Sequence, residues 1–362
     1  MTGFPCFARC REATMTCRSR CCCTVVIALA FAFVSNVGRS AAEEPAPTIA
    51  PVPMAWAIQP PLPDPKEAEN ISGAACYRVN GARKSCLLAS DEADSGKYAR
   101  FFTIDDHTIV PGPTITLLPK KRHGQKMKET DVEGVSFAEG SYYLIGSHGL
   151  SKKAAEFQLS RFFVYRFRVD SGTGMPGFPF GGESPAQEVE RSDHLRAVIA
   201  ATPKLQGYAE KPLDEHGVNI EGLAVRGDRL FLGFRGPVIN GKAQVMSVNI
   251  DAAFGSAPAS PQVFPISLGD GMGVRDLVTV ADGFLVLSGP EADELSEADL
   301  FFWDGRSAAP ARLGMLGGVP DGAKPEAVLV LAEDMEAYRL LIMSDGIPGG
   351  APTEYRVSKQ KR

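Results

Sequence analysis

A short phrase of sequence recurs five times along the chain and constrains its fold more than any other feature. The clearest copies are Asp131–Phe137 followed by Tyr142–His148, and Asn219–Val225 followed by Leu230–Arg235. In each copy two apolar runs, often rich in β-branched or aromatic residues, flank a short turn, which in three copies contains glycine. This pattern predicts a β-hairpin in which both strands are largely buried.

The other three copies are looser, and further strand-like runs follow every copy. The copies are Gly273–Val280 with Phe284–Ser288, Asn70–Cys76 with Cys86–Glu92, and Pro325–Val330 with Arg339–Asp345. The following runs are Tyr98–Ile104 and Thr114–Leu118, Phe163–Val169 and Leu195–Ala200, Ala243–Val248 and Val263–Ser267, Leu300–Trp303 and Ala311–Leu313, and lastly Glu354–Val357 alone. Repeated four-stranded units are typical of a β-propeller, in which each sheet buries its faces against its neighbours.

We therefore predict an all-β chain that forms a β-propeller of five four-stranded blades, closed by an N-terminal strand at Met54–Gln59. Glycine and proline number 37 and 27 among 362 residues, which favours short strands and turns over long helices. Ser171–Glu190 and Lys204–Gly217 are predicted to be loop insertions in blade two. A β-sandwich, or two β-domains, remains the alternative architecture.

The first 42 residues have the features of a signal peptide. Four arginines precede the apolar stretch Cys21–Val34, which is shorter than the ~20 residues that a membrane-spanning helix needs. Small residues at Ser40–Ala42 predict cleavage after Ala42, and an uncleaved anchor is the alternative. We expect residues 1–42 to be a signal peptide, 43–65 a proline-rich lead-in that includes the closing strand, and 66–358 the propeller.

Export would leave an acidic protein in an oxidising compartment, periplasmic or secreted. Residues 1–42 contain five arginines and one glutamate, so their removal changes the formal charge from −5 to −9. An acidic surface argues against nucleic-acid binding, and no membrane span is expected after cleavage. Cys76 and Cys86 are the two cysteines that remain, and we predict a disulfide between them within one hairpin; two free thiols are the alternative.

The hairpins also predict where a functional site lies. The start of the first strand and the end of the second strand of a hairpin lie at the same end. If these strands are the two inner strands of each blade, all five ends meet at one mouth of the central channel. The polar and charged residues at these ends are Asp91, Glu92, Asp131, Glu133, His148, Glu221, Arg235, Arg275, Asp276, Glu326 and Asp345.

Three interpretations of this set stay open. Glu133, Glu221 and Glu326 are candidate ligands of a hard cation such as Ca²⁺, which prefers oxygen donors. Arg235 and Arg275, with His148 and Asp276, are candidates for binding a small anion. The third interpretation is structural, with carboxylates and arginines pairing across blades.

Other chemistries are disfavoured by the pattern. None of the five histidines has the spacing of zinc ligands, and the nucleophile-elbow pattern G-x-S-x-G is absent. The prediction is a monomeric binding module, with Ca²⁺ as its candidate cofactor and a small anionic ligand or a periplasmic protein as its partner. The alternative is a metal-assisted hydrolase of phosphoesters or other esters.

The segments Asn219–Ala224, Leu230–Pro237, Gly273–Leu277 and Leu287–Pro290 resemble the bacterial family catalogued as domain of unknown function 3616. The copies around Ser72–Gly73 and Asp131–Gly134 are similar to the earlier segments of that family, so the resemblance extends from about Ile71 to Asp345. It implies kinship with exported, propeller-like proteins and carries no activity. The Glu-Gly blade opening, as at Glu133–Gly134 and Glu221–Gly222, is also similar, more distantly, to propellers described as esterase-like phytases.

Overall fold

The computed structural model describes residues 47–80, 83–92, 98–122, 124–151, 155–292 and 297–360. The chain divides into two units, Met1–Glu44 and Pro45–Arg362, and the described residues lie in the second unit. The predicted signal peptide, residues 1–42, lies outside the described residues. Among the helices that are described, none is both long and apolar enough to cross a lipid bilayer.

Five antiparallel sheets follow one another along the chain, and each corresponds to one copy of the repeat. Blade one is β3 (Ile71–Asn80), β4 (Arg83–Ser90), β5 (Tyr98–Asp105) and β6 (Thr108–Thr116), and blade two is β9 (Val132–Ala138), β10 (Ser141–Gly146), β11 (Val164–Arg168) and β12 (Glu190–Ser192). Blade three is β13 (Asn219–Arg226), β14 (Arg229–Ile239), β15 (Lys242–Asn249) and β16 (Gln262–Ile266). Blade four is β17 (Met272–Val280), β18 (Gly283–Pro290), β19 (Asp299–Trp303) and β20 (Ala311–Leu316), and blade five is β21 (Lys324–Glu333), β22 (Ala337–Asp345) and β23 (Thr353–Ser358).

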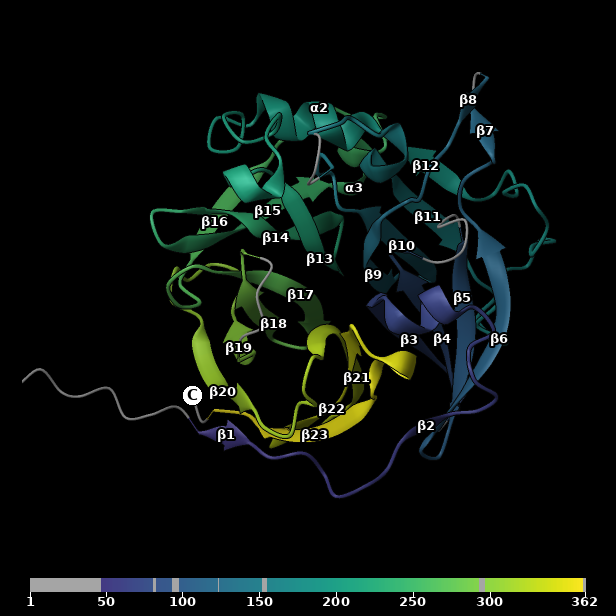
Figure 1. Cartoon of the computed structure of the whole chain (residues 1–362), viewed down its shortest axis with the longest axis vertical. Helices are drawn as coiled ribbons and strands as arrows, with labels where there is room; N and C mark the ends of the chain where they lie inside the picture. The colour runs from purple at the N-terminus through teal and green to yellow at the C-terminus, as the bar shows by residue number, and fades with distance from the viewer. Residues whose placement is uncertain are drawn as a thin grey trace, which may run out of the picture. The chain divides into compact units, whose positions relative to one another are not determined.

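The first strands of the blades form a closed ring around the axis. β3 contacts β9, β9 contacts β13, β13 contacts β17, β17 contacts β21, and β21 contacts β3 again. Figure 1 looks along this axis, and the five sheets radiate from the ring. The predicted five-bladed propeller is therefore confirmed, and the predicted hairpins are the two inner strands of each blade.

The hairpin turns form where the sequence predicts them, for a local reason. Gly140 (φ 75°) and Gly227 (φ 59°) take the left-handed conformation that a tight turn needs and that other residues adopt at a cost. Between the blades, apolar side chains from facing sheets pack into clusters, such as Leu285, Leu300, Val328 and Leu340 between blades four and five. Each sheet therefore depends on its neighbours for burial.

The N-terminal segment closes the ring differently from the prediction. β1 (Thr48–Ile49) pairs in parallel with β20 of blade four, Pro51 bridges to Tyr355 of blade five, and β2 (Ala57–Ile58) pairs in parallel with β6 of blade one. Met54–Gln59 is thus not the fourth strand of blade five. The segment contains several prolines, which lack the N–H that a ladder needs, so it makes only short pairings along the outer edges of three blades.

The fourth strand of blade two is also not where the sequence predicted it. Leu195–Ala200 lies in helix α2 (His194–Ala201), and the edge strand is the short β12. Leu195, Val198 and Ile199 are buried, and their spacing of three and four residues matches one face of a helix. The predicted insertions are loops, apart from Glu190 in β12 and the 3₁₀ helix η2 (Leu213–Glu215).

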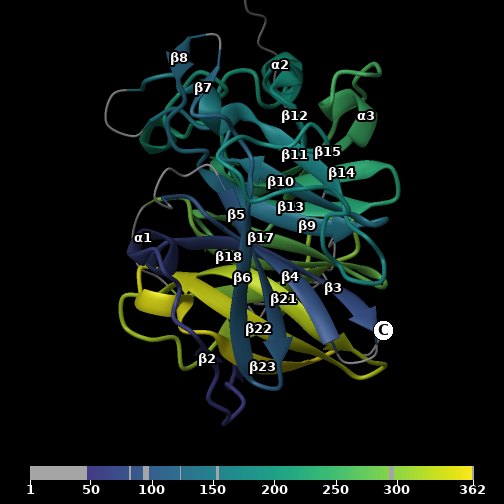
Figure 2. The same cartoon turned by 90° about the vertical axis from the view of Figure 1, so that its right-hand side faces the viewer.

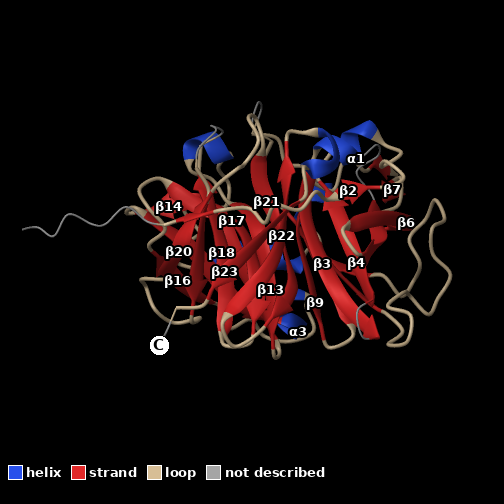
Figure 3. Cartoon of the chain, turned by 90° about the horizontal axis from the view of Figure 1, so that it is seen from below, coloured by secondary structure: helices blue, strands red, loops and turns tan. Residues whose placement is uncertain are grey.

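The remaining helical pieces lie at the ends of the strands. α1 (Pro65–Glu69), which precedes blade one, and α3 (Ile250–Ala253) lie at opposite ends of the propeller in Figure 3. In Figure 2, β3 starts on the side of α1 and points away from it. Glu67 of α1 is buried and pairs with Arg100 of β5 through two N–O distances of 2.7 Å, which fixes α1 to blade one.

Short elements occupy the connections between β6 and β9, between β10 and β11 and between β22 and β23. They are β7 (Lys121–Arg122) paired with β8 (Gln125–Lys126), η1 (Leu159–Phe162) and η3 (Pro348–Gly350). The predicted disulfide is present and joins Cys76 of β3 to Cys86 of β4, which are direct partners in the hairpin of blade one.

Candidate functional site

One residue near the start of each repeat is left out of the strand pairing because the backbone bulges there. In every inner hairpin the pairing register skips one residue near the start of the first strand, as in β13, where Ile220 and Gly222 are paired and Glu221 is not. The five bulge residues are Ser72, Glu133, Glu221, Arg275 and Glu326. A β-bulge redirects a side chain locally, so the repeat itself builds a ring of polar side chains.

The residue after each bulge explains the glycine of the Glu-Gly phrase. A Cβ atom on Gly73 would lie 2.6 Å from the carbonyl oxygen of Glu133, and one on Gly222 would lie 2.9 Å from Cβ of Leu277. Glycine therefore allows neighbouring first strands to approach closely around the axis. In blade four Asp276 occupies this position, and its carboxylate accepts hydrogen bonds from the backbone N–H groups of Leu277 and Val328.

A polar cavity of about 510 Å³ lies at the end of the channel where the first strands begin. Seven acidic and three basic residues line it: Asp91, Glu92, Asp131, Glu133, Glu221, Glu326, Asp345, Arg161, Arg235 and Lys324. Eight of the eleven residues predicted from the hairpin ends are in the lining. Farther along the first strands, a cavity of about 110 Å³ is lined mostly by apolar residues such as Val135, Leu223 and Leu277.

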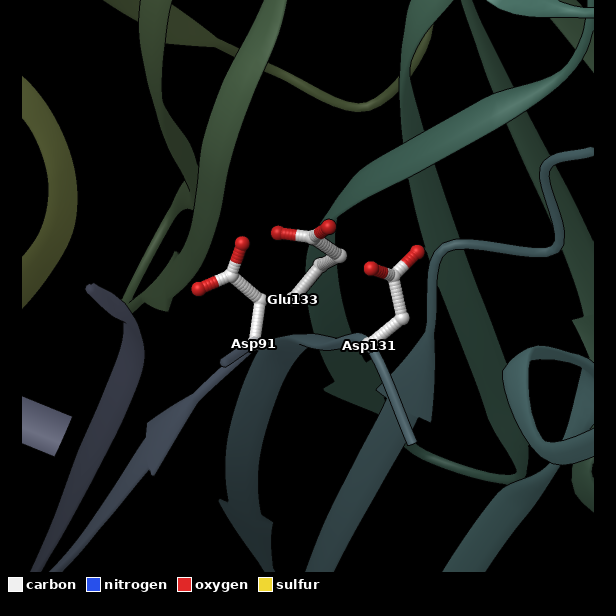
Figure 4. Close-up of side chains that lie close together, drawn as sticks. All are labelled: Asp91, Asp131 and Glu133. Carbon is white, nitrogen blue, oxygen red and sulfur yellow. The ribbon is translucent and has the colours of Figure 1, made fainter. Parts of the chain in front are cut away.

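Three carboxylates on the side of blades one and two come together. Asp91 follows β4, Asp131 precedes β9 and Glu133 is the bulge residue of β9; one oxygen from each lies within 4.8 Å of the others. Figure 4 shows the three carboxylates clustered in one space. We call this group the acidic cluster. Asp131 accepts a hydrogen bond from Ser147 Oγ and lies 3.1 Å from Arg161 Nη1.

The acidic cluster is under electrostatic strain. Oδ1 of Asp91 is buried and has no hydrogen-bond partner. Burial, with the nearby charges of Asp131 and Asp345, raises the pKa of Asp91 well above its usual value. Burial and the charges of Asp131 and Asp91 likewise raise the pKa of Glu133, which is 9% exposed. A cation within the cluster would relieve both costs.

On the side of blades three to five, arginines neutralise the carboxylates. Nη1 of Arg275 lies 3.1 Å from Glu221 Oε2 and 2.8 Å from Glu326 Oε1. Nη1 of Arg235 lies 3.2 Å from Glu221 Oε1, and its other nitrogens donate to the backbone oxygens of Glu291 and Ala292. Burial raises the pKa of Glu326, and Arg275 opposes that rise.

The structure therefore separates the residues that the sequence grouped as metal ligands. Glu133 belongs to the acidic cluster, whereas Glu221 and Glu326 are ion-paired with arginine. The guanidinium groups of Arg235 and Arg275, which the sequence suggested for anion binding, are directed at carboxylates and carbonyls of the protein.

His148 and Asp276 are not among the residues that line the cavity. The His148 ring is buried against Phe162, and its Nδ1 lies 3.0 Å from the oxygen of Gly146. Burial lowers the pKa of His148 to about 4, so its ring is neutral at pH 7. Asp276 reaches from blade four to the backbone of blade five, and burial raises its pKa to about 8.

Sequence reasoning missed several residues that line the cavity. Asn70, Asn219 and Lys324 occupy the same position of the repeat as Asp131, two residues before the bulge residue, so this register would have identified them. Ser147 directly follows β10, and it lines the cavity in place of its neighbour His148. Arg161 lies in η1, outside the repeat, and nothing in the sequence pattern pointed to it.

The arrangement favours a cation over an anion as the species that binds. Seven carboxylates and three basic groups line the cavity, so the lining carries an excess of acidic groups. Counting Arg275, which pairs with Glu326 of the lining, does not reverse this excess of acidic groups. Carboxylate oxygens are the donors that hard divalent cations such as Ca²⁺ prefer.

The chain resembles solved structures only distantly. The major allergen Mala s 1 of Malassezia sympodialis is 14% identical with a TM-score of 0.38, and the match covers 80% of this chain and 78% of that protein. An exo-β-1,3-galactanase of Phanerochaete chrysosporium is 12% identical with a TM-score of 0.46, and the match covers 86% of this chain and 64% of the enzyme. The arabinanase Arb43A of Bacillus subtilis is 11% identical with a TM-score of 0.37, and the match covers 79% of this chain and 92% of that enzyme. At such distances no activity transfers from them to this chain.

Sequence comparison is more specific for one part of the chain. No curated protein matches it significantly. Residues 183–347, which extend from the loop before β12 to the end of β22, match the model of the family described as protein of unknown function DUF3616. The suspected resemblance is thereby confirmed: residues 183–347 of this chain match the DUF3616 family.

Proposed function

We propose that this protein is an exported binding module that holds one Ca²⁺ ion at Asp91, Asp131 and Glu133 and uses it to bind a small anionic ligand. The observation that carries the proposal is the buried Oδ1 of Asp91, which lacks a hydrogen-bond partner and lies among two other carboxylates. A buried carboxylate without a partner is costly, and a bound cation supplies the missing interaction.

The geometry suits a hard cation with open coordination positions. Ca²⁺ takes six to eight oxygen ligands, and three carboxylates supply only some of them. Because the acidic cluster lines a cavity of about 510 Å³, the other positions face space that water or a ligand can enter. A ligand with a carboxylate or phosphate group would meet the ion there, without help from the engaged Arg235 and Arg275.

A purely structural role for the charged ring explains only one side of it. Glu221, Glu326, Arg235 and Arg275 satisfy one another by ion pairing. Within the acidic cluster, Arg161 pairs with Asp131, and no described residue forms an ion pair with Asp91 or Glu133. The uncompensated charge lies where the cavity is, which favours a bound ion.

The predicted signal peptide supports the proposal that the protein is exported. An exported location is in turn consistent with Ca²⁺ as the bound metal. A disulfide within blade one is typical of an oxidising compartment. The binding partner that fits is a small anion or the acidic side chain of another exported protein, and the propeller is proposed to act as a monomer.

Calcium binding is tested by calorimetric titration and thermal unfolding of the protein without its signal peptide. We expect one Ca²⁺ per chain and an increase in Tm, since an ion present at 100 times its Kd adds about 2.7 kcal/mol of stability. The variants Glu133→Gln and Asp91→Asn should lose both effects. Glu190→Gln, which alters an exposed pair with Arg166 outside the cavity, is the matched control. Absence of any calcium response in the wild-type protein would refute the proposal.

A second candidate function rests on the same open positions of the ion. A metal at the cavity lining would polarise an ester oxygen, which is the requirement of metal-assisted hydrolysis of phosphoesters or other esters. A panel of phosphoesters and lactones, assayed with and without chelator, tests this candidate. Turnover that is lost with chelator and in Glu133→Gln would make the protein an enzyme, and binding without turnover would leave it a binding module.

A further inference from the structure

Blade four departs from the repeat at the position that faces the axis. The bulge residue is Ser or Glu in the other four blades, and in blade four it is Arg275. Its side chain is 4% exposed, and one nitrogen contacts the carboxylates of both adjacent blades, Glu221 and Glu326. A positive charge therefore lies in the axial ring between two carboxylates, whose negative charges would otherwise repel each other.

The surroundings of Arg275 are shaped for this side chain. A Cβ atom on Gly289, in the paired strand β18, would lie 2.8 Å from both Cγ and Nε of Arg275. A Cβ atom on Gly273, two residues before it, would lie 2.1 Å from the backbone oxygen of Arg235. Nη2 of Arg275 also donates to the oxygen of Pro290 at 3.4 Å. Glycine at position 289 therefore leaves room for the Arg275 side chain, and glycine at position 273 allows β17 to approach the backbone of β14.

The position of the Arg275 guanidinium determines which carboxylates are available as ligands of a bound cation. Glu221 is engaged by both Arg235 and Arg275, and Glu326 by Arg275, whereas Glu133 belongs to the acidic cluster. Removing the guanidinium of Arg275 would leave Glu326 without its arginine and Glu221 with Arg235 alone, so the two buried carboxylates would lack the charge between them.

We propose that Arg275 is a built-in cation that limits the cavity to one divalent ion, and that removing its charge creates a second cation site at Glu221 and Glu326. This inference rests on the proposed calcium site and deepens it, because it assigns the residue that sets the stoichiometry. Arg275 acts here as a positioning residue: it contacts the carboxylates and not the ion.

The test is the number of Ca²⁺ ions bound by Arg275→Met, a neutral side chain of similar length. Calorimetry, with elemental analysis after gel filtration, should give one ion for the wild type and two for Arg275→Met. Arg275→Lys, which keeps the charge, should bind one. Arg312→Met removes an arginine that pairs with Asp299 at the outer part of blade four, and this control should also bind one.

Thermal unfolding provides a second readout. In chelator, Arg275→Met should unfold at a lower temperature than the wild type, and Ca²⁺ should raise its Tm by more than it raises that of the wild type. Arg275→Gln, whose amide still donates one hydrogen bond, is the alternative variant if the Met variant is too unstable in chelator. Both variants are purified in Ca²⁺, because the ion is expected to replace the guanidinium.

The outcomes separate the two proposals. If the wild type binds no Ca²⁺, the proposed function fails, whereas one ion bound by Arg275→Met would still support the role of Arg275. If the wild type binds one ion and a folded Arg275→Met binds one with unchanged affinity, the role of Arg275 is overturned. Failure of both neutral variants to fold in Ca²⁺ would overturn it as well, because the ion would then be unable to replace the guanidinium.

Discussion

The two sides of the axial ring are built by the same repeat and differ in where arginine lies: among the described residues, arginine pairs with the carboxylates of the bulge residues on one side only. On the side of blades three to five, Glu221 and Glu326 share Arg275, and all three are buried. On the side of blades one and two, Asp91 and Glu133 have raised pKa values and no such partner among the described residues. The β-bulge that all five blades share thus places one side chain per blade in the ring. Single residues then decide whether a carboxylate of the ring is paired with an arginine or is available to a bound ion.

The largest effect should come from removing a shared carboxylate on the paired side. Glu221→Gln leaves Arg235 and Arg275 with less compensation, and breaking a buried ion pair costs about 3–5 kcal/mol of stability. In chelator, Glu133→Gln should leave the free energy of unfolding unchanged or raise it, since it removes a buried uncompensated charge. Urea unfolding of both variants checks this contrast, and equal losses would show that the two sides are not electrostatically different.

A smaller loss of stability is expected from substitutions where the first strands of neighbouring blades are in contact. Gly73→Ala and Gly222→Ala each push a methyl group into an adjacent strand, and overpacking of this kind costs about 1–3 kcal/mol. Gly177→Ala, where nothing lies within 4 Å and φ is not positive, should change stability by less than about 0.5 kcal/mol.

The two buried glycine variants should differ in calcium binding. In Gly73→Ala the added methyl group presses on the backbone oxygen of Glu133, so the affinity for Ca²⁺ should fall. In Gly222→Ala the methyl group presses on Leu277, so the affinity for Ca²⁺ should stay near the wild-type value. Titration calorimetry of the folded variants measures this difference. Similar affinities in both variants would contradict a calcium site at Glu133.

A further effect concerns pH and the buried carboxylate of Asp276, which accepts hydrogen bonds from two backbone N–H groups. Burial raises its pKa to about 8, so the folded protein holds this proton more tightly than the unfolded chain. The stability that Asp276 contributes is therefore complete below pH 4 and is lost as the pH rises through 8. Chemical unfolding in chelator between pH 5 and pH 9 should show a decline that is weaker in Asp276→Asn, and parallel profiles would contradict this.

The architecture was predictable because its signals are local. Apolar runs around glycine turns specify hairpins, and five copies of the same order specify a ring of blades. The mouth was predictable for the same reason, since strand direction alone brings hairpin ends together. The helix at His194–Ala201 was misread because a short apolar run is compatible with either period until its partners are known. The path of the N-terminal segment was misread because its pairings join residues far apart in the chain.

The sequence by itself determined the repeat, the blade number, the disulfide pairing and the collection of charged residues at one mouth. Only the tertiary structure decided how those charges are divided, with Arg275 between Glu221 and Glu326 and with Asp91, Asp131 and Glu133 together. The reason is physical. A repeat specifies which residues are equivalent, but ion pairing depends on which blades are neighbours in space and on the burial that makes an unpaired carboxylate costly.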